Sequence, residues 1–156
     1  MKGNKKMKCA NEMKEIRAIA NLAYEAEEQA KAIAAYAKAC AATVDLCENR
    51  IGAMLEKKAL QHGEEHVTIS FPIDFAYNRL GNRLFRMVTE RPHVYANGDS
   101  SWEPSKEEYS YETLVNYLAK FCYATTIKER DFRVKRYCFG DYRYSTIEIT
   151  TAPECE

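Results

Sequence analysis

Apolar residues recur at alternating steps of three and four along the first third of the chain, from Ile16 to Met54. A seven-residue repeat of this kind is typical of a helix that packs against another helix along one seam. No polar residue interrupts the seam. One set of seam positions holds Ile16, Ala23, Ala30, Ala37, Val44 and Ile51, and the other holds Ile19, Ala26, Ile33, Cys40, Cys47 and Met54.

The composition around the seam also favours a helix. Between Asn11 and Gln61 there is no proline and a single glycine, Gly52, while alanine, the strongest helix former, is the most frequent residue. Gly63 is placed to end the helix in a left-handed conformation. We therefore predict a helical arm over residues 9–61, preceded by a basic, flexible N-terminus over residues 1–8.

The predicted arm is too long for one small domain to cover. A helix of about 50 residues is roughly 75 Å long, whereas the remaining residues would form a domain on the order of 30 Å across. We expect either a continuous, coiled-coil-like helix covered by another chain, which would make the protein an oligomer, or a helical hairpin. The hairpin would break near Thr43–Asp45, where Asp45 and Glu48 are suited to cap a second helix.

The second half of the chain predicts a compact α+β domain over residues 66–151, followed by a tail over residues 152–156. Residues 67–71 alternate apolar and polar side chains, as a strand does. We predict helices over 74–91, with Tyr77, Leu80, Leu84 and Val88 on its apolar side, and over 110–124, then strands over 132–139 and 142–150. The predicted fold is β-α-α-β-β, with both helices on one face of a three-stranded antiparallel sheet.

The last two predicted strands surround a Gly140-Asp141 dipeptide that suits a two-residue turn. This turn places Val134 opposite Ile147 on the inner face and Arg133 opposite Glu148 on the outer face. It also gathers aromatic rings at the tip of the outer face, while Arg136 and Arg143 lie on the other face. The rings belong to Tyr137, Phe139, Tyr142 and Tyr144.

Charge and cysteine content narrow the classes of protein. The chain has 23 lysines and arginines and 23 aspartates and glutamates, so no overall field draws it to nucleic acid or to an anionic membrane. Its 6 cysteines form no C-x-x-C pair, which favours reduced thiols in a cytoplasm over a secreted disulfide scaffold. No apolar run is long enough to span a bilayer, and the basic start precedes an amphipathic helix instead of a signal peptide's apolar segment. We expect a cytoplasmic protein.

Three arginines are spaced to share one face of the helix predicted over residues 74–91. Guanidinium groups bind phosphate and carboxylate with two parallel hydrogen bonds, so such a row suits nucleic acid or an acidic protein surface. The alternative is an ordinary solvent-facing surface with local ion pairs. Trp102, the single tryptophan, lies in a loop rich in tyrosine and glutamate, where it either anchors a partner or packs onto the sheet. The predicted partner-binding residues are Arg79, Arg83, Arg86, Trp102, Arg136, Tyr137, Phe139, Tyr142, Arg143 and Tyr144.

Sequence motifs give little support for catalysis. The segment HGEEH, from His62 to His66, is not the H-E-x-x-H zinc motif and has no third ligand nearby, so we predict no metal. Phosphate-binding glycine loops and the G-x-S-x-G motif are absent from the sequence, so we predict no cofactor. A cysteine-dependent enzyme, with Cys122 or Cys138 activated by His93, is the weakest alternative.

These features together predict a non-enzymatic binding protein. It would act through protein–protein contact as an adaptor or an inhibitor, and a phage or mobile-element protein directed at a nucleic-acid-handling complex is one such case. The partner would be another protein, a second copy bound through the arm, or both. The second hypothesis is direct nucleic-acid binding through Arg79, Arg83, Arg86 and the hairpin over residues 133–144.

Overall fold

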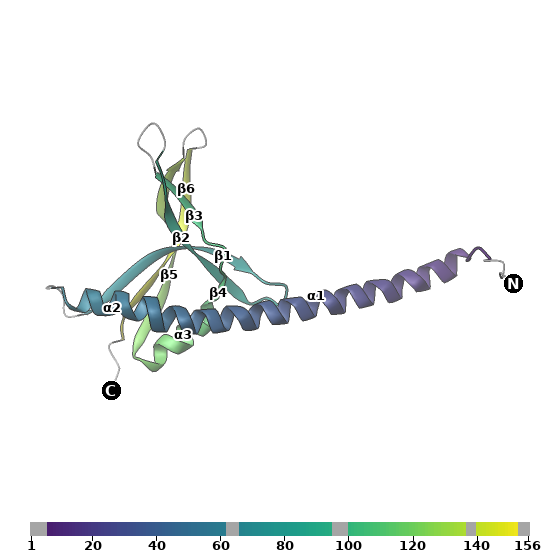
Figure 1. Cartoon of the computed structure of the whole chain (residues 1–156), viewed down its shortest axis with the longest axis horizontal. Coiled ribbons are helices and arrows are strands. Elements are labelled where there is room, and N and C mark those ends of the chain that lie inside the picture. The colour runs from purple at the N-terminus through teal and green to yellow at the C-terminus, as the bar shows by residue number, and fades with distance from the viewer. Residues whose placement is uncertain (1–5, 62–65, 95–99, 137–139, 153–156) are drawn as a thin grey trace.

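The computed structural model describes residues 6–61, 66–94, 100–136 and 140–152. A long helix leads into an antiparallel sheet that carries a second, short helix, so the predicted α+β class is confirmed (Figure 1). The predictions for the N-terminus, for Gly63 as a cap and for the tail fall wholly or largely outside the described residues.

The arm is one continuous helix. Helix α1 (Ala10–Leu46) passes through a single π-helical turn, η1 (Cys47–Ile51), into α2 (Gly52–Ala59). Leu46 and Cys47 keep right-handed helical backbone angles at the first junction, and the predicted break near Thr43–Asp45 does not occur. The continuous helix is therefore confirmed, and the helical hairpin is wrong.

The π turn keeps one side of the arm directed at the domain. Residues four apart drift around an α-helix by about 40° per step, because four residues exceed the 3.6 residues of one turn. The extra residue of a π turn rotates the helix back, so that Thr43, Cys47, Ile51 and Leu55 are all buried. Gly52 fits this turn, because a Cβ atom there would lie only 3.2 Å from the carbonyl oxygen of Cys47.

The rest of the chain forms a 6-stranded sheet in which neighbouring strands are antiparallel. Its order is β3-β2-β1-β6-β5, with β4 paired to β2, and helix α3 (Tyr111–Lys120) follows β4 in the chain. The predicted three-stranded sheet is therefore wrong, and so is the helix predicted over residues 74–91. The strands are β1 (Thr68–Tyr77), β2 (Arg83–Val94), β3 (Ser100–Pro104), β4 (Tyr109–Ser110), β5 (Tyr123–Arg136) and β6 (Gly140–Thr151).

The helix predicted over residues 74–91 is instead the end of β1, a turn and most of β2. Leu84, Phe85, Met87 and Val88 are all buried, and β2 contributes to clusters on both of its faces, with Phe85 and Met87 in one and Val88 in the other. A strand that is buried on both faces loses the alternation that identifies strands. Its apolar positions then match a helical spacing by coincidence.

The turn between β1 and β2 has its own sequence signal. The side-chain Oδ1 of Asn78 accepts hydrogen bonds from the backbone N–H groups of Leu80, at 3.1 Å, and Asn82, at 2.8 Å. Gly81 has a φ angle of +84°, which favours glycine. The Asn-x-x-Gly-Asn spacing could therefore have indicated a turn inside the predicted helix.

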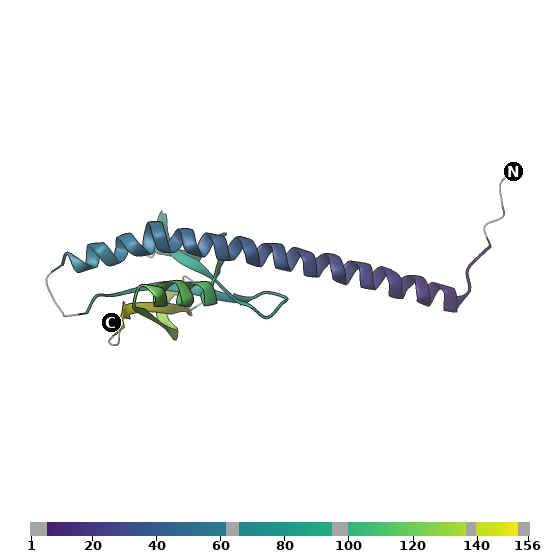
Figure 2. The ribbon, with the colours of Figure 1, turned by 90° about the horizontal axis from the view of Figure 1, so that it is seen from below.

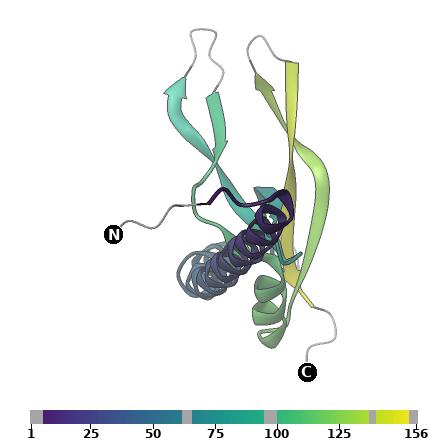
Figure 3. The ribbon, with the colours of Figure 1, turned by 90° about the vertical axis from the view of Figure 1, so that its right-hand side faces the viewer.

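The main core lies between the sheet, α3 and the second half of the arm, which runs alongside α3 in Figure 2. Ile73 of β1, Phe85 of β2, Leu114 of α3 and Ile147 of β6 are fully buried there. The hairpins β2–β3 and β5–β6 extend to one side of the arm (Figure 3). A second, smaller cluster joins them and comprises Val88, Val134 and Tyr144, with Trp102 and Phe132 packed against it.

Thr43 is the polar contact that holds the arm against β4 and α3. Its hydroxyl donates to the carbonyl of Ala39 at 2.6 Å and accepts a hydrogen bond from the N–H of Ser110 at 2.7 Å, and both Thr43 and Ser110 are fully buried. The side chain of Ser110 in turn caps α3 by accepting from the N–H of Thr113 at 3.2 Å. Thr43 therefore links the arm to the backbone of the domain through a buried hydrogen bond.

Thr43→Val should destabilise the fold by about 1–3 kcal/mol, because it keeps the side-chain shape and deprives the buried N–H of Ser110 of its acceptor. Thr126→Val, on an exposed position of β5, is the matched control and should cost less than about 0.5 kcal/mol. Urea unfolding followed by circular dichroism measures both. Equal midpoints for the two variants would contradict this role of Thr43.

The β5–β6 hairpin has a different register from the predicted one. Arg136 pairs with Gly140 and Val134 lies opposite Tyr142, so the turn is not the Gly140-Asp141 dipeptide. A bulge between Lys128 and Phe132 shifts the pairing further along the strands. Arg133 lies opposite Arg143, not Glu148, and forms an ion pair with Asp141. Val134 is buried, as the sequence predicted, although its neighbours differ.

Helix α3 begins as predicted but ends at Lys120, short of Ala124. Cys122, with a φ angle of +68°, then turns the chain into β5.

Cys122 is disulfide-bonded, whereas Cys9, Cys40 and Cys47 are free. The expectation that the thiols are reduced is therefore wrong at Cys122.

Candidate functional site

Two different faces of the arm carry its apolar residues. One face packs on the domain through Ala39, Thr43 and Leu46, which are all buried. Continuing this face toward the N-terminus in steps of three and four leads to Tyr36 and Glu28. Tyr36 lies 3.4 Å from the hydroxyl of Ser110, and Glu28 pairs with Arg79 of the β1–β2 turn at 3.8 Å. The arm is thus attached to the domain along this face as far as Glu28.

The domain covers the C-terminal part of the predicted seam and leaves its N-terminal part exposed. Its C-terminal members Cys47 and Ile51 are buried in the main core, and Met54 packs against it. Its N-terminal members are exposed, with relative accessibilities of 44% for Ile16, 68% for Ile19 and 54% for Ile33. We call Ile16, Ile19, Ala23, Ala26, Ala30, Ile33 and Ala37, all of them exposed, the exposed seam.

The exposed seam points away from the domain. At about 100° per residue, its positions lie about a quarter of a turn or more around the helix from the middle of the face that Tyr36, Ala39 and Thr43 form. The arm also extends well beyond the sheet toward the N-terminus (Figure 1). No described residue of the domain therefore covers the seam, either where the arm is free or where it crosses the sheet.

The other sides of the arm carry most of its charged side chains, together with the exposed Met13, Leu22 and Tyr24. Lys31 pairs with Glu27 at 3.8 Å and with Glu28 at 3.4 Å, one helical turn away. Exposed ion pairs of this kind add little stability but keep that side of the helix solvated. The free half of the arm is therefore amphipathic, and its apolar side has no cover within the described chain.

The three arginines that were predicted to form a row do not share a face. Arg79 lies in the turn, and Arg83 and Arg86 point to opposite faces of β2, because an odd spacing reverses the side of a strand. Arg83 is half-buried, with its guanidinium 4.6 Å from the ring centre of Phe75 and its Nε donating to the hydroxyl of Tyr77 at 3.2 Å. The premise of a helical arginine row is therefore wrong.

The remaining predicted partner-binding residues also separate. Trp102 is half-buried and packs edge-on against Phe132, with ring centres 5.0 Å apart, so the alternative in which it packs onto the sheet is the one observed. Tyr144 is buried, while Tyr142 and Arg143 are exposed on opposite faces of β6. Tyr137 and Phe139 lie outside the described residues, as does the side chain of Arg136.

A cavity of about 340 Å³ lies beside the π turn. Leu55, Val67, Leu118 and Phe121 give it an apolar wall, and Glu48 lies at the same site. Glu48 accepts a hydrogen bond from the hydroxyl of Tyr117 at 3.3 Å. Cys47 also lines it, but burial and the nearby Glu48 raise the pKa of this thiol to about 11. Cys47 is therefore a protonated core thiol at neutral pH, not a nucleophile.

Alkylation should distinguish the free thiols. At pH 8, Cys47 should react at least about 100-fold more slowly than the exposed Cys9, because raising a thiol pKa by two units lowers its thiolate fraction by that factor. The rate at Cys47 should rise as the pH approaches 11, and in urea the two should converge. Mass spectrometry of iodoacetamide-treated protein measures each rate, and similar rates in the native protein would contradict the burial of Cys47.

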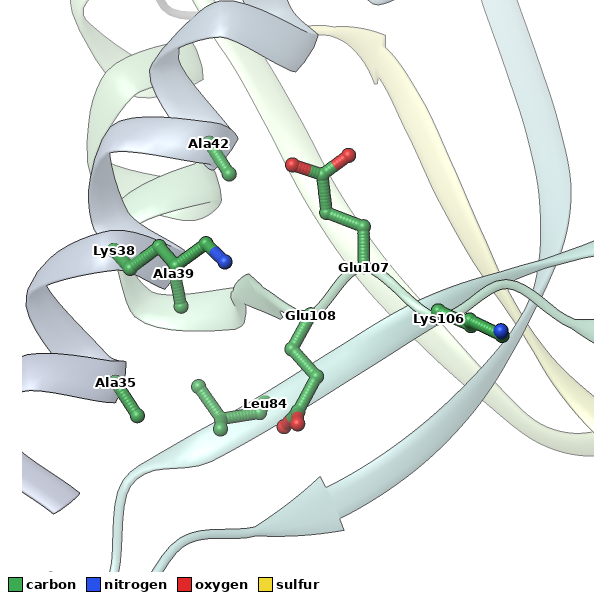
Figure 4. A pocket seen from close by; sticks show the side chains of 8 residues that line it. All are labelled: Ala35, Lys38, Ala39, Ala42, Leu84, Lys106, Glu107 and Glu108. Atoms are coloured by element: carbon green, nitrogen blue, oxygen red, sulfur yellow. The ribbon is translucent and has the colours of Figure 1, made fainter. Parts of the chain in front are cut away.

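A second cavity, of about 400 Å³, separates the arm from the segment that precedes β4 (Figure 4). Ala35, Ala39 and Ala42 form a low wall on the arm, and Leu84 closes it from β2. Figure 4 shows that the carboxylates of Glu107 and Glu108 point in different directions from the facing segment. The carboxylates do not converge on one point, so this cavity offers no assembled set of catalytic groups.

The described part of the chain contains no candidate metal centre. No group of three histidine, cysteine, aspartate or glutamate side chains there could hold a metal ion. His66 lies 3.1 Å from the hydroxyl of Thr151, while His62, Cys138 and the side chain of His93 lie outside the described residues. Among the described helices, none is both long and apolar enough to cross a membrane.

The arm is the most distinctive surface of this protein: an amphipathic helix whose apolar side is free over at least five turns. Helices of globular proteins normally bury such a side against another element. Comparisons with known proteins add no assignment. The chain matches no family model, no curated protein and no solved structure.

Proposed function

We propose that this protein is a non-enzymatic binding protein, an adaptor or inhibitor, that contacts other proteins through the exposed seam of its arm. The observation that supports the proposal is the row of exposed isoleucines and alanines along α1. Contiguous apolar surface of this kind is unusual on a monomeric protein and marks interaction sites. A helix that lays its apolar side against a partner is a common recognition mode.

The arrangement of the chain suits this function. The second half of the arm is held by the main core and by Thr43, so the domain presents the first half as a rigid, projecting element. A preformed helix loses less conformational entropy on binding than a disordered segment does. The direct nucleic-acid alternative has weaker support, because Arg79, Arg83 and Arg86 do not form a row and two of them already pair with Glu28 and Glu129.

Site-specific photo-crosslinking in the native cell tests the proposal. A photoreactive amino acid at Ala23, on the exposed seam, should give covalent adducts with protein. The same amino acid at Asn21, two residues away on the polar side of the helix, should give few. Adding Ile19→Glu to the Ala23 probe should reduce its adducts by about tenfold or more, because a charge placed in an apolar contact is not compensated.

The choice of probes makes the outcome decisive. Both positions are exposed on the same stretch of helix, so a difference between them reports the face and not the location. If the Ala23 probe yields no protein adducts, or no more than the Asn21 probe, the exposed seam is not the binding surface and the proposed function fails.

A further inference from the structure

The part of the exposed seam from Ile16 to Ile33, which leaves out Ala37, is nearly symmetric about its own centre. Its bulky residues lie at the two ends, Ile16 and Ile19 at one and Ile33 at the other, and Ala23, Ala26 and Ala30 lie between them. The steps between these positions are three, four, three, four and three residues, which read the same in both directions. A two-fold interface needs this property, because each surface must complement itself.

We infer that the occupant of the exposed seam is a second copy of this chain, bound antiparallel through α1. This inference rests on the proposed function and names the partner for the same surface. The two-fold axis would pass between Ala23 and Ala26. The three layers on each side of the axis would then pair Ala23 with the partner's Ala26, Ile19 with the partner's Ala30, and Ile16 with the partner's Ile33.

The side-chain volumes fit this pairing. Alanines at the centre allow the two helix backbones to approach closely, which a partner helix with large central residues would prevent. Farther out, Ile19 of each copy is matched with an alanine, so the close approach continues. Ile16 and Ile33 then close both ends of the interface. The exposed isoleucines of the seam would be covered without overpacking.

The positions that flank the seam also suit an antiparallel pair. Leu22, which is 68% exposed, would lie beside the partner's Gln29, whose methylene groups can cover it. Glu27 would lie beside the partner's Ala20, so the two copies place no like charges opposite each other. The remaining charged residues of this stretch, such as Arg17 and Lys31, project away from the seam.

The domains leave room for the second helix. Each domain contacts its own arm through the face of Ala39 and Thr43, whereas the partner would lie on the exposed seam. In an antiparallel pair the two domains lie at opposite ends, because the pairing from Ile16 to Ile33 lies within the N-terminal half of each arm. An overlap of about 30 residues is roughly 45 Å long. Such a strip is no larger than an average specific interface, so we expect a dissociation constant on the order of 10 µM.

Sedimentation equilibrium of the full chain tests self-association. The mass should rise from 18.0 kDa toward twice that value as the concentration increases from about 1 to about 200 µM. Ile19→Glu should weaken the dimer at least about 100-fold and keep the protein monomeric. Asn21→Glu adds the same charge on the polar side and should leave the dimer intact. Circular dichroism should show unchanged helix content at high concentration for the Asn21 variant and a folded domain for both.

Disulfide trapping tests the orientation. Ile16→Cys and Ile33→Cys are made separately, with different tags, in protein that carries Cys9→Ser and Cys40→Ser, and the two are mixed and oxidised. An antiparallel pair gives the mixed disulfide between the two variants. A parallel pair gives disulfides between identical variants, and that result overturns the inference.

Failure of this inference can be told apart from failure of the proposed function. A wild-type protein that stays monomeric up to about 200 µM, well above the expected dissociation constant, overturns self-association. If the Ala23 photoprobe still captures a different protein in the cell, the proposed function survives with another partner. If that probe captures nothing as well, both fail.

Discussion

Phe85→Ala is expected to lower the free energy of unfolding by about 3–5 kcal/mol, because it empties a fully buried ring position in the main core. Phe85 lies opposite Phe75 in the β1–β2 ladder, and its ring centre is 5.4 Å from that of Tyr109. The substitution removes contacts with β1 and with β4 at once. Urea unfolding monitored by circular dichroism measures the loss.

The matched variant for Phe85→Ala is Leu80→Ala. In a helix over residues 74–91, Leu80 would belong to the apolar side and Phe85 would not. In the structure Leu80 lies in the β1–β2 turn and is partly exposed, so its replacement should cost less than about 1 kcal/mol. The reverse order of effects, with Leu80→Ala the more damaging, would favour the helix and contradict the sheet.

Tyr144→Ala should cost about 3 kcal/mol, because Tyr144 is buried in the cluster that joins the two hairpins. Tyr142→Ala should cost less than about 1 kcal/mol, because its ring is 42% exposed. The two rings are in contact, with centres 4.7 Å apart, so this comparison separates burial from aromatic content. Thermal unfolding of the variants measures both effects.

The same pair of tyrosines tests the observed register of β5 and β6. Tyr144 lies opposite Phe132 and shares a face with Val134, whereas the turn predicted from the sequence placed it on the opposite face from Val134. Equal and small effects of the two substitutions would mean that Tyr144 is exposed, and the register would then be wrong. A large effect confined to Tyr144 would support the pairing of Phe132 with Tyr144.

The sequence alone determined the arm. Helix formation depends on local properties, namely alanine content, the absence of proline and a seven-residue repeat, and all of them lie within the segment from Asn11 to Gln61. The start of α3 was also predicted, because the cap at Ser110 is a local hydrogen bond. The inward face of Val134 followed from the alternation of its own strand. Each of these inferences needed no knowledge of distant residues.

Only the tertiary structure decided which side of the arm is covered, and that the segment Arg83–Val94 forms the strand β2 and not part of a helix. The repeat identifies a seam, but whether Ile33 or Ile51 is buried depends on where Thr43 meets Ser110, 67 positions away in the chain. Likewise, Phe85 and Val88 are both buried because separate clusters cover the two faces of β2. Packing against distant residues leaves no regular spacing of apolar side chains in a short segment, because a different neighbouring element covers each face of the strand. The exposed seam, and with it the candidate binding surface, is therefore a consequence of packing.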